Sequence, residues 1–323
     1  MRKLRLLAAL VGAGLLIGPQ SSVAQASAEA PMTPTAEMTM TQSPKTGTLK
    51  VPGATLYYES WGHGPMLLII PGGPQDAGVF ADLAHALADR YTVVAYDPRG
   101  NSRSTFDGAI QPLDLDIQAD DAAALIDALG QGQAYVMGTS GGAHIGLNLA
   151  ARYPEKVKAV VAHEPPSTML LEDPAEAIAF DEAVHATYKS EGVEAAMGMF
   201  FGAAGMSESP EADAAPDFEM SPEAAETFAR VSGNFEYWLA HAMLPLSHYT
   251  PDVETLKAGA PRVIVGIGAD SRGSPIEELS MALVNALGVV PVTFPGDHTG
   301  FEPHADAFAE TLHQTFGANQ GDS

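Results

Sequence analysis

Short apolar runs alternate with longer amphipathic segments along most of this chain. The apolar runs suit strands buried on both faces of a parallel sheet, and they cover residues 66–70, 92–96, 134–137 and 156–162. Segments with helical spacing follow the first three runs, at 78–90, at 115–129 and up to residue 153. Residues 48–51 and 54–60 predict a hairpin before the first buried strand. The alternation predicts an α/β fold with a mainly parallel sheet flanked by helices.

This strand pattern stops between residues 167 and 259, where helical patterns take over. Helices are predicted at 175–189, 193–201 and 221–244, and the last has a good start signal in Ser221-Pro222-Glu223. Strands resume at 262–267 and 290–294, each followed by a helical segment, 275–287 and 303–316. We therefore expect one core made of residues 48–166 and 260–318, with residues 167–259 inserted as a helical cap.

The predicted cap is rich in large apolar side chains, and an acidic stretch at 207–219 predicts a mobile loop within it. The large apolar residues are Met197, Met199, Phe200, Phe201, Phe235, Trp238 and Met243. Over an active site they would line a pocket for an apolar substrate. Packing between the cap helices explains any single one of them equally well.

The N-terminus has the pattern of a secretory signal. A basic start with Arg2, Lys3 and Arg5 precedes an apolar run at 6–17 that is short for a bilayer span, and A-x-A sites end at Ala26 and Ala28. We expect a signal peptide at 1–26, a flexible linker at 27–47, and a secreted or periplasmic mature protein without stable membrane association. An uncleaved anchor is the alternative, and the short apolar run disfavours it.

The net negative charge of the chain disfavours some classes of binding partner. The 323 residues carry a net charge of −24, and removal of Arg2, Lys3 and Arg5 with the signal leaves 13 basic against 40 acidic residues, a net charge of −27. Such a surface repels phosphate backbones and anionic lipids, which argues against nucleic-acid and membrane partners. The chain has no cysteine, so it forms no disulfide.

A glycine-rich turn joins the strand that ends near Met137 to the next helix. It reads Gly138-x-Ser140-x-Gly142. In a strand-turn-helix elbow of this kind the serine occupies a strained conformation with its hydroxyl exposed, and small neighbours are needed because strand and helix nearly touch. The turn therefore predicts a nucleophile at Ser140, although a closely packed glycine turn without chemistry would show the same motif.

A second glycine-rich segment, residues 71–74, leaves the carboxyl end of the first buried strand, where ligands bind in open α/β sheets. Of its residues, Gly73 is the favoured backbone N–H donor to a ligand, Gly72 is less favoured, and Pro74 has no N–H. In the charged loop after the next strand, Asp97 and Arg99 are expected to brace the loop.

The order of these motifs, with Gly296-Asp297-His298 after the last predicted strand, resembles the α/β-hydrolase fold superfamily. The resemblance implies that Ser140 is the nucleophile, that His298 is the general base, and that the N–H groups of Gly73 and Gly141 form the oxyanion hole. Two positions depart from the pattern: Pro71 stands where many relatives have histidine, and Ser102 stands where they often have glycine. His144, on the helix after the elbow, is expected to lie near the site without being the base.

Two carboxylates compete for the acid that orients His298. Asp270 follows the penultimate strand, the commonest position in the superfamily. Glu164 ends the strand after the nucleophile, in an apolar stretch where a charge needs a partner. The burial argument favours Glu164 slightly, and Asp270 remains open.

The sequence thus predicts a secreted serine hydrolase that cleaves an ester of a small, apolar molecule, as carboxylesterases do, through an acyl-enzyme and without metal or cofactor. Alternatives within the same fold are an aminopeptidase of the proline iminopeptidase type, with Glu236 or the 207–219 stretch binding a free amino terminus, and a cofactor-free haloperoxidase-like enzyme. A non-catalytic protein that uses the fold as a ligand pocket is an alternative of another class.

Overall fold

A computed structural model describes residues 43–203, 220–259 and 261–317. The predicted signal peptide, the acidic stretch at 207–219 and most of the predicted linker lie outside these residues. Part of the linker prediction is wrong, because the first strand begins at Lys45, which pairs with Ser60. Across the described residues, no helix is both long and apolar enough to cross a membrane.

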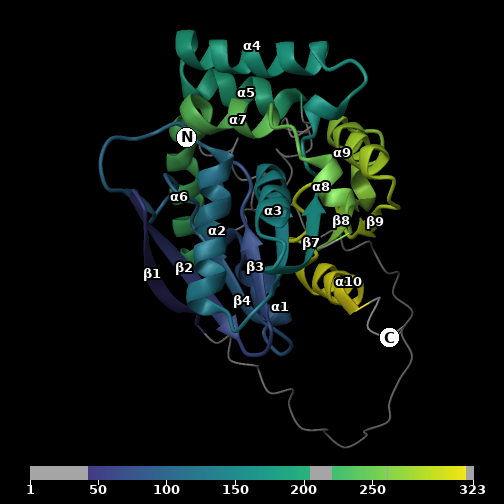
Figure 1. The fold of residues 1–323 in the computed structure, drawn as a ribbon. Coiled ribbons are helices and arrows are strands. Elements are labelled where there is room, and N and C mark those ends of the chain that lie inside the picture. The colour runs from purple at the N-terminus through teal and green to yellow at the C-terminus, as the bar shows by residue number, and fades with distance from the viewer. Residues whose placement is uncertain (1–42, 204–219, 260, 318–323) are drawn as a thin grey trace, which may run out of the picture.

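One mixed sheet forms the centre of the fold (Figure 1). Its order is β1-β2-β4-β3-β6-β7-β8-β9, with the short β5 paired to β2. Pairing is antiparallel from β1 to β4 and parallel from β4 to β9, as the apolar runs predicted. The strands are β1 Lys45–Val51, β2 Ala54–Gly62, β3 Met66–Ile70, β4 Thr92–Tyr96, β5 Thr105–Phe106, β6 Ala134–Thr139, β7 Val157–His163, β8 Arg262–Gly268 and β9 Val292–Phe294.

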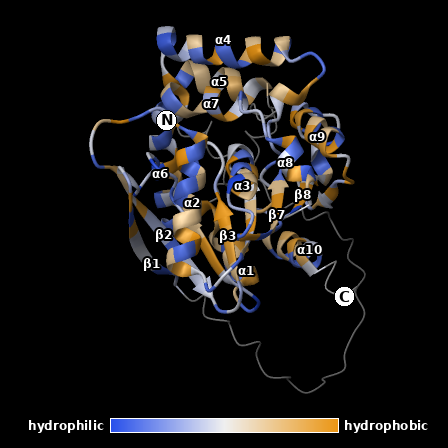
Figure 2. Cartoon of the chain, viewed as in Figure 1, coloured by the Kyte–Doolittle hydropathy of each residue, from blue (hydrophilic) through white to orange (hydrophobic). Residues whose placement is uncertain are grey.

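Alternate residues of the central strands face two hydrophobic layers. In β3, Leu68 and Ile70 belong to one layer and Leu67 and Ile69 to the other, and all four side chains are fully buried. The first layer holds α2 (Leu115–Leu129), α3 (Gly141–Arg152) and α9 (Pro275–Leu287), and the second holds α1 (Ala81–Leu87) and α10 (Ala305–Gly317). Figure 2 shows the resulting contrast between apolar central strands and helices with one polar side.

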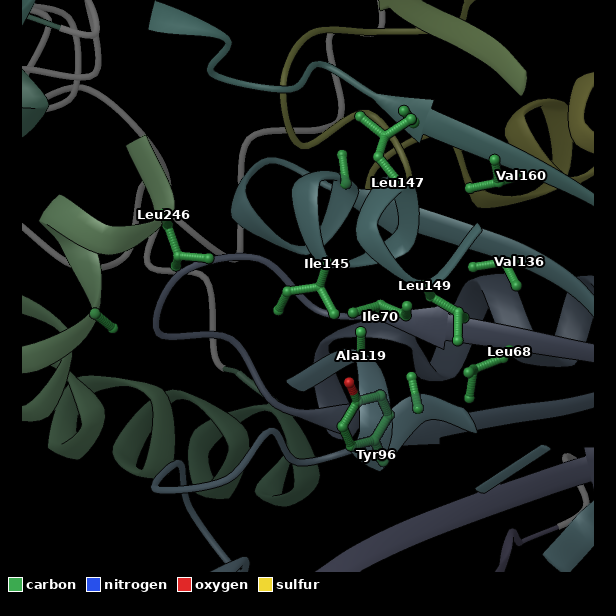
Figure 3. Packing of buried hydrophobic residues seen from close by; sticks show 14 of the residues in the cluster. Leu68, Ile70, Tyr96, Ala119, Val136, Ile145, Leu147, Leu149, Val160 and Leu246 are labelled. Carbon is green, nitrogen blue, oxygen red and sulfur yellow. The ribbon is translucent and has the colours of Figure 1, made fainter. Parts of the chain in front are cut away.

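The described residues between β7 and β8 form a cap above the carboxyl ends of the strands (Figure 1). Its helices are α4 (Ala175–Glu191), α5 (Val193–Ala203), α6 (Pro222–Tyr237), α7 (Met243–Ser247) and α8 (Val253–Lys257). The cap shares one hydrophobic cluster with the core: Leu246 of α7 belongs to the layer that contains Ile145 of α3 and Ile70 of β3 (Figure 3). The cap is therefore packed onto the core.

The single helix expected at 221–244 is interrupted. A π-helical turn, Trp238–Ala242, separates α6 from α7. A π turn changes the backbone hydrogen-bond pattern, and here carbonyls in the turn have partners outside it. The Leu239 carbonyl lies 2.8 Å from Nδ1 of His185, and the His241 carbonyl accepts from the N–H of Leu113 at 2.9 Å. The partners in these bonds are far away in the sequence, so the local pattern did not reveal the interruption and predicted one continuous helix.

Candidate active site

The elbow at Ser140 has the geometry that its glycines predicted. Ser140 lies between β6 and α3 with φ 53° and ψ −126°, a strained conformation for a residue with a side chain. A Cβ on Gly138 would lie 2.3 Å from the Gly142 carbonyl oxygen, and one on Gly142 would lie 2.2 Å from the Ile70 carbonyl oxygen. No other residue fits at either position. Ser140 is partly exposed.

Ser140 and Glu164 leave the sheet side by side. Thr139 pairs with His163 across β6 and β7, and each candidate is the next residue in its chain. The N–H of Ser140 donates to the His163 carbonyl at 2.9 Å, and that of Glu164 donates to the Gly266 carbonyl at 3.0 Å. Parallel strands end at the same edge, which brings serine and acid together.

Glu164 is the carboxylate that contacts His298. Nδ1 of His298 lies 2.7 Å from Oε2 of Glu164, while Oε1 accepts from the Gly268 N–H at 2.8 Å. The Glu164 side chain is fully buried and that of His298 is 27% exposed. Because an ionised carboxylate only accepts hydrogen bonds, Nδ1 carries the proton and Nε2 is left as the basic nitrogen.

The electrostatics keep Glu164 ionised. Burial acts to raise the pKa of Glu164, but the hydrogen bond and charge of His298 outweigh burial and hold the pKa at about 2. The buried Ser271 side chain also acts to lower the pKa of Glu164, as the smallest of these contributions. A charged acid beside His298 stabilises the protonated imidazole that forms when it accepts a proton.

Asp270 has a different position. It lies on a short 3-10 turn, Ala269–Ser271, directly after β8, and its side chain is exposed. Its backbone N–H donates to the Gly296 carbonyl at 2.9 Å, which fixes the loop that carries His298. Of the two competing carboxylates, the structure therefore brings Glu164 to His298.

The hydroxyl of Ser140 makes no hydrogen bond to His298 within the described part of the chain. In free enzymes the bond between nucleophile and base is often long or poorly aligned, and it tightens when substrate binds. Of the contacts expected for a serine-histidine-acid set, the structure thus shows the one between histidine and acid.

The 71–74 loop presents Gly73 as its free donor. The Gly72 N–H donates to Oε1 of Gln75 at 3.1 Å, whereas the N–H groups of Gly73 and of Gly141, the first residue of α3, have no protein acceptor among the described residues. A Cβ on Gly72 would lie 2.4 Å from the Thr139 carbonyl oxygen, so the loop touches the elbow. The backbone donors expected for an oxyanion hole are thus unoccupied beside the serine.

Both candidate donors are flanked by cap residues. The indole nitrogen of Trp238 lies 3.4 Å from the position of a Cβ on Gly73, and the Leu246 side chain lies 2.8 Å from that of a Cβ on Gly141. His144 connects α3 to the same part of the cap, because its Nδ1 lies 2.7 Å from the Leu246 carbonyl oxygen. The cap therefore forms part of the surroundings of the serine.

The large apolar cap residues divide into groups. Phe200 contacts Phe201 and Trp238, and Phe201 contacts Phe235, with ring centroids 5.9, 4.9 and 6.2 Å apart. Packing inside the cap thus accounts for Phe201 and Phe235, while Trp238 also reaches Gly73. Met197 and Met243 are buried. Met199 is 36% exposed and packs against Thr187 of α4, so it belongs to the contact between α4 and α5.

His144 is fully buried, and its Nε2 lies 3.1 Å from the Ser167 hydroxyl. Burial lowers the pKa of His144 to about 4 despite its bond to Leu246, so it is a neutral link between helix and cap.

The charged loop after β4 is braced as expected. Asp97 accepts from Arg103 at 2.7 and 2.8 Å, and Arg99 forms two bonds to Asp121 at 2.9 and 2.7 Å. Glu236 is exposed on α6.

Sequence reasoning missed three polar residues that hold the 71–75 segment. Gln75 bonds Gly72, Asn101 donates to the carbonyls of Gly73 and Gln75 at 3.1 and 3.0 Å, and Asn234 of α6 donates to the Pro74 carbonyl at 2.8 Å. The sequence did contain one indication, because Asn234 is a polar residue at helical spacing from the apolar residues Val231, Phe235 and Trp238. The structure shows all four to be buried.

Comparison with known proteins agrees with this architecture. Residues 65–232 match the family model described as alpha/beta hydrolase fold. The chain is 34% identical over 277 residues to an uncharacterized hydrolase, YraK, of Bacillus subtilis, which covers 83% of this chain and 94% of YraK. It is 38% identical over 108 residues to 2-(acetamidomethylene)succinate hydrolase of Mesorhizobium japonicum, covering 33% of this chain and 38% of that protein. The structure of a thermophilic esterase from Thermogutta terrifontis superposes with a TM-score of 0.64 at 18% identity, covering 86% of this chain and 99% of the esterase.

Proposed function

The chain belongs to the α/β-hydrolase fold family, and from that premise we propose that it is a serine hydrolase that cleaves esters of small, apolar molecules. Ser140 is the proposed nucleophile, His298 the base and Glu164 the acid that orients it. The observation that carries the proposal is the buried, ionised Glu164 bonded to Nδ1 of His298, one strand away from a serine held at φ 53°.

In the proposed reaction the Ser140 hydroxyl attacks the ester carbonyl carbon as its proton passes to Nε2 of His298. The carbonyl oxygen becomes an oxyanion and accepts hydrogen bonds from the N–H groups of Gly73 and Gly141. Collapse of this intermediate breaks the bond to the alcohol oxygen, which takes the proton from His298 and leaves as the alcohol. Water then attacks the acyl-enzyme, giving its proton to His298. Collapse of the second intermediate breaks the bond to the Ser140 oxygen, which takes that proton back from His298, and the acid is released.

Preference for apolar esters is supported by the cap residues beside the two backbone donors. Leu246 lies against Gly141 and Trp238 lies against Gly73, so the carbonyl carbon would react between apolar side chains. The ester bond is further supported by the fold shared with an enzyme named as an esterase. The hydrolase from Mesorhizobium is named for a substrate that carries an acetamido group, which is an amide. Cleavage of amides should therefore be measured alongside cleavage of esters.

The proposal is tested with p-nitrophenyl esters of two to twelve acyl carbons and the matching p-nitroanilides, using the protein without residues 1–26. We expect ester turnover that the Ser140→Ala variant lacks, with kcat/KM rising with acyl length and then falling. Absence of ester turnover in the parent protein, or equal turnover in Ser140→Ala, would contradict the proposal.

The export predicted from residues 1–26 belongs to the same proposal. Expression of the full chain in a bacterium with a secretion pathway should yield a mature N-terminus directly after Ala26 or Ala28. N-terminal sequencing of the exported protein checks this, and a retained Met1 would contradict it.

A further inference from the structure

One face of the cap helix α6 rests on the segment that presents the Gly73 donor. Three residues one turn apart make the contact: Arg230 and Asn234 of α6, and Trp238, the first residue of the π turn that follows it. Nε of Arg230 donates to Oδ2 of the fully buried Asp76 at 2.6 Å, and Trp238 lies against Gly73. The middle residue, Asn234, is 5% exposed and makes the largest number of these bonds.

Asn234 uses both ends of its amide. Its Nδ2 donates to the Pro74 carbonyl and to the Ser102 hydroxyl, each at 2.8 Å, and its Oδ1 accepts from the Ser102 N–H at 2.7 Å. A buried amide with three such bonds is held in one orientation, and a side chain without polar atoms leaves all three partners unpaired.

The bond to Ser102 gives a physical reason for an unusual residue. Ser102 has φ 46°, a conformation that residues with side chains rarely adopt and glycine adopts readily. Asn234 binds the N–H and the hydroxyl of Ser102 together, which stabilises the left-handed conformation. The serine at this left-handed position is therefore matched to the asparagine on the cap.

Two routes lead from Asn234 to the donor. The direct route is its bond to the carbonyl of Pro74, the residue after Gly73. The second route passes through Ser102 to the adjacent Asn101, whose amide donates to the carbonyls of Gly73 and Gln75. Asn101 is 3% exposed, so this chain of bonds lies out of water. Both routes hold the carbonyls that follow the Gly73 N–H, those of residues 73 to 75. The Gln75 N–H in turn donates at 3.0 Å to the Gly72 carbonyl, which belongs to the same peptide group as the Gly73 N–H.

We propose that Asn234 is a positioning residue of the oxyanion hole, through which the cap helix α6 sets the direction of the Gly73 N–H. This role rests on the proposed hydrolase function. It makes α6 a fixed part of the reaction site, because displacement of α6 would release the donor. Asn234 acts through the backbone of Gly73 and does not itself touch the substrate.

The test compares Asn234→Leu, which keeps the volume of the side chain and removes all three bonds, with the parent protein. With p-nitrophenyl acetate we expect kcat to fall about 10- to 100-fold while KM stays within about threefold, because a misdirected donor weakens binding of the transition state more than of the ester. The matched control is Tyr237→Phe, which removes one bond of the same helix to the Gln111 carbonyl and should keep kcat within about twofold.

Thermal unfolding of each variant separates positioning from stability. If Asn234 only anchors the cap, the Leu variant melts at a lower temperature while its kcat, measured well below that temperature, stays within twofold of the parent. That result overturns the positioning role. Asn234→Ser, which is smaller and polar, serves where the Leu variant does not fold, and it should also lose kcat without a matching rise in KM. A parent protein without turnover overturns the proposed function itself.

Discussion

Two carboxylates at the ends of neighbouring parallel strands have opposite surroundings in this protein. Glu164 follows β7, is fully buried and bonds His298, whereas Asp270 follows β8, is exposed and contributes its backbone N–H to the loop that carries the histidine. The difference lies in how the chain leaves each strand. After β7 it turns through a left-handed residue, Glu164 at φ 46°, while after β8 it enters a 3-10 turn. A position at a strand end brings a carboxylate near the site. The backbone conformation of that residue then determines whether its side chain reaches His298.

The largest expected effect is on Glu164. In Glu164→Gln the side chain keeps its size but no longer stabilises the protonated His298, and its amide can donate to Nδ1 and favour the wrong tautomer. We expect kcat for p-nitrophenyl acetate to fall about 10³- to 10⁴-fold, as when the acid of a serine protease triad becomes an amide. Steady-state kinetics check this, and a loss below tenfold in a folded variant would remove Glu164 from the proposed triad.

The second effect is on stability in acid. The pKa of Glu164 is about 2 in the folded protein and near 4.5 without its partners. A lowered folded-state pKa stabilises the fold above the unfolded-state pKa, and this stabilisation, on the order of a few kcal/mol, is lost as the pH falls from about 4.5 toward 2. Thermal unfolding at pH 7 and pH 3 should therefore show a steeper loss for the parent than for Glu164→Gln. Parallel losses would contradict the assignment.

A smaller effect is expected at the β8 end, from Ser271. Its buried hydroxyl acts to lower the pKa of Glu164, so Ser271→Ala removes one of the groups that compensate for burial of the charge. We expect a loss of about 1 kcal/mol in the free energy of unfolding and of about three- to tenfold in kcat. Chemical denaturation and kinetics measure both. No change in either would show that Ser271 does not assist Glu164.

The smallest effect is expected at Asp270 itself. Asp270→Asn keeps the backbone N–H that bonds Gly296 and changes only an exposed side chain, so kcat should stay within about twofold. This variant is the matched control for Glu164→Gln. A fall of more than tenfold would reverse the comparison between the two strand ends.

The sequence predicted the fold well because the burial of strands and helices determines where apolar residues stand along the chain. The strands Met66–Ile70 and Thr92–Tyr96 and the helix Leu115–Leu129 have the bounds that their apolar patterns predicted. The glycines at 138 and 142 likewise predicted the elbow, because the close contact between strand and helix leaves no room for a side chain at these two positions.

Other features depend on contacts that a local pattern does not contain. The choice between Glu164 and Asp270 required the backbone angle at residue 164. Asn234 acts on Ser102, 132 positions away, and the π turn after α6 has partners on α4 and before α2. Such bonds are set by how the cap docks on the core, which emerges only from the assembled structure.

The most direct test of the central claim, an activated serine at position 140, is intact mass after treatment with a fluorophosphonate. The reagent phosphonylates serines whose hydroxyl is activated by a neighbouring base and whose oxyanion hole accepts the new P–O group. We predict one adduct on the parent protein, none on Ser140→Ala, and slow labelling of Glu164→Gln. An unlabelled parent, or an adduct that persists in Ser140→Ala, would contradict the account.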